Sequence, residues 1–154
     1  MFKRIAALSA LLTLAASAAF AASALDKDTL VAATESTYPP YESRNEKGEL
    51  VGFDIELTET VAKKLGKKVE WLDMPFDSIP ALMSGKVDLV AAGMSATPER
   101  AKRVNFSAPY EISFSAFVTG IENPPQDTDA LAGKIVAVQI GTVQENFARS
   151  LGNV

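Results

Sequence analysis

Cysteine and histidine are both absent from this chain of 154 residues. These side chains are the usual ligands of zinc and other transition metals, and histidine is the general base of the commonest hydrolytic triads. Their absence argues against a transition-metal centre and against hydrolase chemistry of that kind. No disulfide can form either, so an apolar core must hold the fold. We expect no metal, no cofactor and no catalytic residue.

Positive charge is also scarce. Lysine and arginine number 15 against 19 aspartates and glutamates, which gives a formal charge of −4. A mildly acidic protein is a poor candidate for binding nucleic acid or an anionic membrane surface. No internal repeat or low-complexity segment follows the first 24 residues. We therefore expect neither nucleic acid nor a membrane surface as a partner.

The N-terminus has the pattern of an export signal. Lys3 and Arg4 precede the uncharged run Ile5–Phe20, and small residues that suit cleavage follow, ending at Ala21 or Ala24. The run is short and rich in alanine, which makes a membrane anchor the weaker interpretation. We expect a signal peptide over about the first 24 residues and export to the periplasm. Its removal takes away two basic residues and makes the formal charge −6.

Beyond the signal, strand-like apolar segments alternate with helix-like segments. This alternation predicts an α/β fold with a mostly parallel sheet. The first helix is indicated by Leu57, Val61 and Leu65, which recur four residues apart from Phe53, and Gly66 ends it. A second, shorter helix is expected over Asp77–Ser84. The expected strands are Thr29–Thr34, Lys68–Met74 and Val87–Ala91.

Ligands of parallel sheets bind at the carboxyl ends of the strands, where the connecting loops separate. Three loops have this position: Glu35–Tyr41, Met74–Asp77 and Ala92–Thr97. They are the candidate binding loops.

The third loop opens a helix in a way that suits an anion. The chain turns at Gly93, Thr97 is the expected N-cap, and Pro98 takes the first helical position, where a missing N–H costs nothing. Arg100 lies on the first helical turn. A helix start beside a guanidinium favours a small anion, most readily a carboxylate. On spacing alone, an ordinary capped helix with a surface arginine explains the pattern equally well.

The last third of the chain repeats this arrangement. Residues 120–130 contain two prolines, and we interpret them as an interdomain connection. The preceding segment Ser113–Val118 has the alternating pattern of an extended chain. An apolar strand is expected over 133–142. Thr142 and Glu145 then match a capping box that opens a helix through Leu151. Two helix starts on two lobes could hold one anion from opposite sides.

A series of short motifs runs through the chain after the signal. They are Thr37–Tyr41, Gly52–Glu56, Ile79–Leu82, Ser84–Asp88, Ala92–Arg100, Asn105–Ser107, Pro109–Tyr110, Gly133–Lys134 and Gly141–Thr142. In order and spacing the chain resembles the extracytoplasmic solute-binding proteins of ABC transporters for polar amino acids, solute-binding family 3. Each motif is weak singly, and together they are highly specific.

The resemblance implies a fold and a function. The fold is a periplasmic-binding-protein-like (type II) α/β lobe over residues 25–120, including a hinge strand, followed by the start of a second lobe over 121–154. The function is binding of a free polar or basic amino acid between two lobes and its delivery to an ABC transporter permease in the inner membrane. Such a protein makes and breaks no bond, and we expect a monomer.

The same resemblance implies the site residues. Arg100 corresponds to the arginine that holds the ligand α-carboxylate, and Thr142 to the contribution of the second lobe. Glu35 stands where relatives carry an acid that contacts a distal polar or cationic group. The other candidates are Tyr38 and Phe76 as walls, Gly93, Met94 and Ser95 beside the α-amino and carboxylate ends, and Gln139 and Gln144 at the rim.

Most of these residues also have a purely structural explanation. Tyr38 and Phe76 could pack their loops on the core, and Glu35 could be a solvated loop charge. Thr142 caps a helix in any case. Asp54, together with its neighbour Glu56, is expected to complement the dipole of the first helix. Tyr110 is expected to be structural.

The second lobe is expected to be incomplete. Residues 121–154 number 34, fewer than the roughly 40 that usually fold without disulfides or metals. We therefore expect a truncated second lobe and weak binding. Two other functions remain open: a sensor module, and a dehydratase-like enzyme on the same scaffold, for which Glu35 is the only candidate acid or base.

Overall fold

The computed structural model describes residues 24–122 and 124–154. The predicted export signal lies outside this part of the chain except for Ala24, which opens a 3₁₀ turn, η1 (Ala24–Asp26). Within the described residues, no helix has the length and apolar character needed to cross a membrane.

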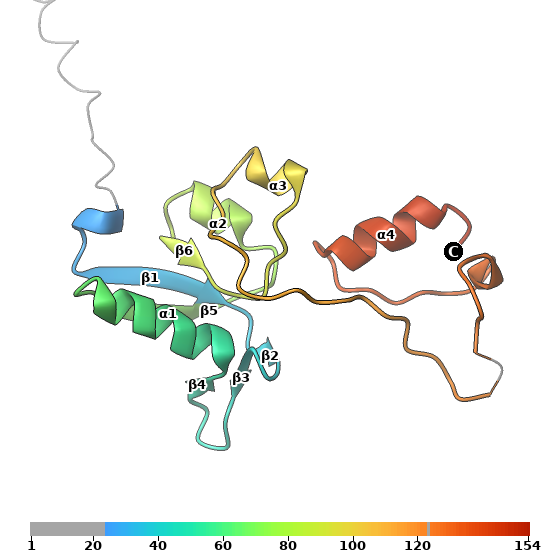
Figure 1. The fold of residues 1–154 in the computed structure, drawn as a ribbon, viewed down its shortest axis with the longest axis horizontal. Coiled ribbons are helices and arrows are strands. Elements are labelled where there is room, and N and C mark those ends of the chain that lie inside the picture. The colour runs from blue at the N-terminus through green and yellow to red at the C-terminus, as the bar shows by residue number, and fades with distance from the viewer. Residues whose placement is uncertain (1–23, 123) are drawn as a thin grey trace, which may run out of the picture.

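A three-stranded parallel sheet forms the core of the first part of the chain, to one side of the molecule in Figure 1. Its middle strand β1 (Thr29–Thr34) pairs along its whole length with β5 (Lys68–Asp73). On its other side β1 pairs through Ala32 and Ala33 with β6 (Leu89–Val90), which is shorter than the sequence predicts. Both alanines are fully buried, as expected for a middle strand of a parallel sheet covered on both faces. The predicted α/β fold with parallel pairing is confirmed.

A small antiparallel sheet follows β1. It contains β2 (Thr37–Tyr38), β3 (Glu42–Arg44) and β4 (Leu50–Val51). The hairpin between β3 and β4 turns at Asn45, whose side-chain oxygen accepts hydrogen bonds from the amides of residues 47 and 49. This local bonding is the usual reason for asparagine in a turn. Gly48 completes the turn with φ 78°.

Helix α1 (Phe53–Lys64) forms as predicted, but its apolar stripe is only partly buried. Ile55 and Ala62 are the buried apolar side chains of α1, whereas Val61 is 48% exposed. Leu57 and Val61 line a groove of about 520 Å³, together with residues of β1 and β6, with α2 (Ile79–Met83) and with residues 104–108 and 110. Spacing alone identified the helix but could not say how deeply each apolar side chain is covered.

Glycine is required immediately before α1. Gly52 has φ 131°, and a Cβ built there would lie 2.2 Å from the carbonyl oxygen of Tyr41. The amides of Phe53 and Asp54 donate to the carbonyls of Pro40 and Tyr41. The start of α1 is thus pressed against the loop that follows β2, and no side chain fits between them.

Helix α3 (Pro98–Ala101) begins as the sequence predicts. Thr97 has extended dihedral angles, its Oγ1 accepts a hydrogen bond from the Arg100 amide at 3.2 Å, and Pro98 takes the first helical position. Helix α4 (Val143–Leu151) is capped in the same way by Thr142, which accepts from the amide of Glu145 at 3.1 Å. The carboxylate of Glu145 accepts from the amide of Gly141, one residue earlier than a standard capping box predicts.

The described residues between α3 and α4 contain no strand. The regular element that forms there is a 3₁₀ turn, η2 (Asp129–Leu131). The strand expected over 133–142 was therefore wrong, and Ser113–Val118 joins no sheet. A strand needs a hydrogen-bonding neighbour, and neither segment has one here. Phe114 is 93% exposed and Ile135 99% exposed. Figure 1 shows α4 set apart from the parallel sheet at the end of this long connection.

Candidate functional site

Arg100 lies where the two parts of the chain meet. Its guanidinium carbon is 5.6 Å from the centre of the Phe76 ring. One terminal nitrogen, Nη1, donates to the carbonyl of Ser95 at 2.6 Å, and the other, Nη2, donates to the carbonyl of Gly141 at 2.8 Å. Burial lowers the pKa of Arg100 and the charge of Asp77 opposes that change, so the side chain stays a cation. It is a held, half-buried positive charge.

We call the region around Arg100, Glu35 and the Gly93 turn the corner. Tyr38 and Phe76 form two aromatic surfaces there. The Tyr38 ring stacks on Tyr41 with centroids 5.0 Å apart, and it stays 50% exposed. A Cβ built on Gly93 would lie 3.3 Å from the Tyr38 ring. The ring therefore lies against the turn that precedes α3, and neither aromatic is buried in the core.

The second part of the chain reaches this corner through three more of the expected site residues. Gln139 donates from Nε2 to the Glu35 carboxylate at 2.6 Å, although 104 residues separate them. The buried hydroxyl of Thr142 donates to the Gln139 carbonyl at 2.7 Å. Gln144 donates to the hydroxyl of Ser115 at 2.8 Å. The bond from Gln139 therefore joins this part of the chain to Glu35, just after β1, whereas the other two bonds lie within residues 115–144.

The turn before α3 places its three expected residues differently. Gly93 has φ 53°, and its amide already donates to Oδ2 of Asp54 at 2.7 Å, so this N–H is not free for a ligand. Ser95 is exposed and accepts from Arg100 through its carbonyl. Met94 lines the apolar groove beside α1.

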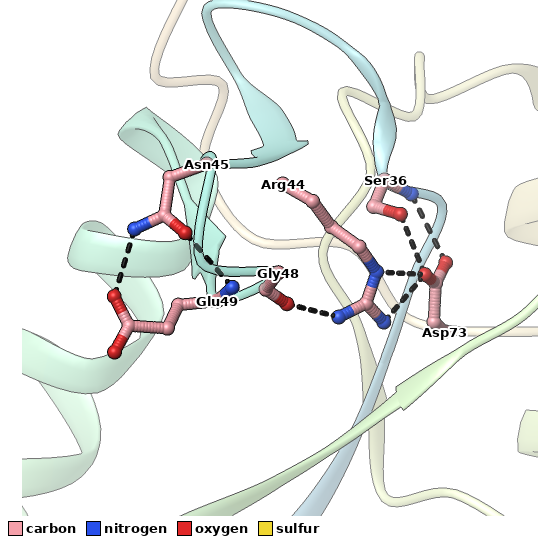
Figure 2. Close-up of polar contacts among 6 residues, drawn as sticks. All are labelled: Ser36, Arg44, Asn45, Gly48, Glu49 and Asp73. Carbon is pink, nitrogen blue, oxygen red and sulfur yellow. Dashed lines mark hydrogen bonds and ion pairs between the residues drawn. The ribbon is translucent and has the colours of Figure 1, made fainter.

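A clamp of charged and polar side chains holds the loop that carries Glu35. Figure 2 shows Asp73, at the end of β5, accepting from the amide and hydroxyl of Ser36 at 3.1 and 2.5 Å and from the Arg44 guanidinium at 3.1 and 2.8 Å. Arg44 also donates to the Gly48 carbonyl at 2.6 Å. Burial raises the pKa of Asp73, but the hydrogen bonds from Ser36 and Arg44 outweigh it and lower the pKa overall. The clamp ties the hairpin and the Glu35 loop to the sheet.

Sequence reasoning did not identify this clamp. Residue 36 lies just after the carboxyl end of β1 and residue 73 is the last residue of β5, and these two strands are parallel neighbours. Polar residues after neighbouring parallel strands meet at one sheet edge, which is the signal that could have paired them.

A second feature that sequence reasoning missed lies beneath the Gly93 turn. Asp54 and Glu42 are each 1% exposed. Asp54 was expected to serve the helix dipole, and Tyr110 was expected to be structural. In the structure Asp54 accepts both the Gly93 amide at 2.7 Å and the Tyr110 hydroxyl at 2.8 Å.

The corner therefore combines one cation, two aromatic surfaces, one carboxylate and the start of a helix. This set can hold a small zwitterion, with its negative end at Arg100 and a positive group toward Glu35. Among the described residues, no group of three or more acidic side chains is placed to hold a metal ion.

Residues 30–145 match the model of the bacterial extracellular solute-binding proteins, family 3. The chain belongs to this family. Its fold is that of a periplasmic-binding-protein-like (type II) α/β protein, and it matches solved members over part of their length. Curated relatives of this family 3 chain include periplasmic and extracellular proteins named as binding histidine or arginine, and an arginine-binding protein of an ABC transporter from Escherichia coli.

Two relatives illustrate the similarity. The arginine-binding extracellular protein ArtP of Bacillus subtilis is 42% identical over 126 residues, which make up 81% of this chain and 49% of ArtP. The histidine-binding periplasmic protein of Escherichia coli is 37% identical over 142 residues, or 91% of this chain and 55% of that protein. The chain thus spans about half the length of the curated relatives it matches.

One of the solved structures that the chain matches is a single domain. The arginine-bound form of domain 1 of an arginine-binding protein from T. maritima, crystallised as a point mutant, is 37% identical with a TM-score of 0.54. The match covers 57% of this chain and 69% of that domain. In that relative, a single domain is bound to arginine.

Proposed function

We propose that this family 3 chain is the solute-binding component of an ABC transporter, which binds a free polar or basic amino acid in the periplasm and delivers it to the permease in the inner membrane. The observation that carries this proposal is the position of Arg100, whose guanidinium joins the Ser95 carbonyl before α3 to the Gly141 carbonyl before α4. A cation between two helix starts suits an α-carboxylate.

The guanidinium has capacity for this ligand. Arginine carries five N–H donors, and Arg100 uses one from each terminal nitrogen on carbonyls. The remaining donors can bind a carboxylate in the two-point geometry that arginine favours. The Phe76 ring beneath the guanidinium restricts its plane. The amino end of α4, which begins beside Gly141, adds the positive end of a helix dipole.

Glu35 favours a basic ligand side chain. Its carboxylate now accepts from the Gln139 amide group at 2.6 Å. An ammonium or guanidinium group would make a charge-assisted bond with Glu35 and displace this neutral donor. The Tyr38 ring, which is 50% exposed, offers a face for the ligand's methylene groups or its cation. Relatives that bind arginine and histidine support the same class.

Binding would act through both parts of the chain. A ligand that contacts Arg100 and the start of α4 together favours arrangements in which these two are close. Movement would take place in the connection that includes residues 115–120, the predicted hinge. No bond is made or broken. Glu35 is the only acid or base expected from the sequence, and its contact with Gln139 does not favour an enzymatic role.

Substitution of Arg100 tests the proposal. We expect L-arginine, L-lysine or L-histidine to raise the thermal unfolding temperature of the wild-type chain, because a ligand that binds only the folded state stabilises it. Arg100→Ala should abolish this increase. Arg103→Ala is the matched control, since Arg103 contacts Met83 outside the corner and should leave the ligand response unchanged.

Isothermal titration calorimetry would give the affinities. If Arg100→Ala retained the ligand response of the wild type, the carboxylate would be held elsewhere and the assignment would be wrong. If no amino acid in a panel of the common twenty stabilised the wild-type chain, the binding function itself would be rejected.

A further inference from the structure

Two buried carboxyl groups lie directly beneath the ligand corner. Glu42 on β3 and Asp54 at the start of α1 are each 1% exposed. Asp54 uses Oδ2 to accept both the Gly93 amide at 2.7 Å and the Tyr110 hydroxyl at 2.8 Å. The second oxygen of Asp54, Oδ1, is buried, and so is Oε2 of Glu42. Neither oxygen accepts a hydrogen bond from an N–H or hydroxyl group of the described residues.

A single proton shared between the two carboxyl groups would give both of these buried oxygens a hydrogen-bond partner. Two ionised carboxylates in contact and out of water are strongly unfavourable, so one of the pair must be neutral. Asp54 already accepts two hydrogen bonds at Oδ2, whereas Oε2 of Glu42 accepts none from the described residues. Glu42 is therefore the neutral member, and its O–H can donate to Asp54. Burial, then the charge of Asp54 and a side-chain hydrogen bond with it, then the charge of Glu35, raise the pKa of Glu42 to about 8.

We propose that Asp54 is a positioning residue for the ligand corner, and that it holds the Gly93 turn as a carboxylate only while its partner Glu42 carries a proton. This inference rests on the proposed function. Gly93 lies against the Tyr38 ring and precedes Ser95, whose carbonyl holds Arg100. Asp54 is thus hydrogen-bonded directly to the turn that contacts the Tyr38 ring and that holds the Arg100 guanidinium.

The surroundings make the arrangement sensitive to pH. The groups that face the pair are Glu35 after β1, the Tyr110 hydroxyl, and the hydrogen-bonded Tyr41 and Glu111. These neighbours offer no positive charge that could stabilise a second carboxylate. When Glu42 loses its proton, repulsion from Asp54 and Glu35 pushes the pair apart and loosens the Asp54 bond to Gly93. Ligand affinity then falls above the pH at which Glu42 ionises.

The test compares wild type with Glu42→Gln in the full chain. Glutamine keeps the size of Glu42, donates to Asp54 and cannot ionise. By NMR, the Gly93 amide resonance of the wild type should titrate with a midpoint at about pH 8, and Glu42→Gln should remove this titration. Glu49→Gln is the matched control, because Glu49 is an exposed carboxylate of the same hairpin and its loss should leave the titration in place.

Affinity provides the second measurement. The dissociation constant for L-arginine should rise several-fold in the wild type between pH 7 and pH 9, and by clearly less in Glu42→Gln. The variant corrects for ionisation of the ligand's own amino group. Tyr110→Phe, which keeps the Glu42–Asp54 pair and removes one donor to Asp54, should retain the Gly93 titration.

The outcomes separate the two proposals. A Gly93 resonance that does not titrate near pH 8, or that titrates equally in Glu42→Gln, overturns the role of the pair. A normal Gly93 titration without any binding of L-arginine, L-lysine or L-histidine supports the role of the pair in holding the turn and rejects the proposed function.

Discussion

At the scale of single residues, the corner depends on side chains that do more than one task. Arg100 stacks on Phe76 and joins two carbonyls from distant parts of the chain. Thr142 caps α4 and also donates to the Gln139 carbonyl. The structural and functional explanations offered by the sequence are therefore not exclusive at these positions, because a residue that orders a loop also fixes what the loop presents.

Gly52 offers a direct test at this scale. Gly52→Ala should destabilise the fold by about 3 kcal/mol or more, because the new Cβ would lie 2.2 Å from the Tyr41 carbonyl oxygen at a φ of 131°. Urea unfolding measures the change. Gly120→Ala is the control, since a Cβ there meets nothing within 4 Å. Equal midpoints for the two variants would show that the backbone at residue 52 can move aside.

At the scale of elements, the hairpin and the loop after β1 are joined by the clamp on Asp73. This clamp connects three separate segments: the end of β5, the loop with Ser36, and β3 with Arg44 (Figure 2). Strands β2 and β4 are each only two residues long. Side-chain hydrogen bonds to Asp73 therefore hold the hairpin in place, as the backbone hydrogen bonds of a longer sheet would.

Removal of the clamp should show in both stability and binding. Asp73→Ala is expected to lower the free energy of unfolding by roughly 1–2 kcal/mol, because the Ser36 amide and the Arg44 guanidinium lose an acceptor. It should also weaken binding of L-arginine, since the Glu35 loop loses its support. Chemical denaturation and calorimetry measure the two effects. Asp127→Ala, which removes an acceptor from the distant connection, should leave the affinity unchanged; a weakened affinity only in the control would contradict the role of the clamp.

At the scale of the whole molecule, the described chain has one well-formed sheet and a long connection with exposed apolar side chains. Ile112, Phe114, Val118 and Ile121 are each at least 85% exposed. Large exposed apolar segments usually mark surfaces that another segment or molecule covers. The division into lobes at residue 120 stays a prediction.

Stability of the whole chain should depend on pH in two opposite ways. The folded-state pKa of Glu42 is raised from 4.5 to about 8, so its contribution is fully present below about pH 4.5 and is lost as the pH rises through about 8. Asp73 and Asp88 have lowered pKa values, so their contributions are present above their unfolded-state values and are lost as the pH falls through the folded-state values.

We therefore expect maximal stability in mildly acidic solution. Between pH 5 and pH 8 the Glu42 contribution should fall by roughly 2–4 kcal/mol, and Glu42→Gln should flatten the profile over that interval. Urea unfolding at a series of pH values measures this. A wild-type profile that is already flat, or one with the same slope in Glu42→Gln, would contradict the assignment of the proton to Glu42.

The sequence by itself determined the features that depend on near neighbours. The Thr97 and Thr142 caps and the extent of α1 follow from interactions within a few residues. Strand β1 follows from its continuous apolar composition, and β5 follows from the alternation of its polar and apolar residues. The family motifs also placed Arg100 and Glu35 among the candidate site residues.

Only the tertiary structure decided which distant groups meet. The face of α1 that packs on the sheet, the failure of 133–142 to form a strand, and the pairing of Glu42 with Asp54 all depend on partners far away in the chain. Burial then changes the chemistry, because a carboxyl group that loses water and gains a charged neighbour behaves differently from the same residue in a loop. Periodicity and motif spacing describe a segment, whereas its neighbours in space set its hydrogen bonds and its charge.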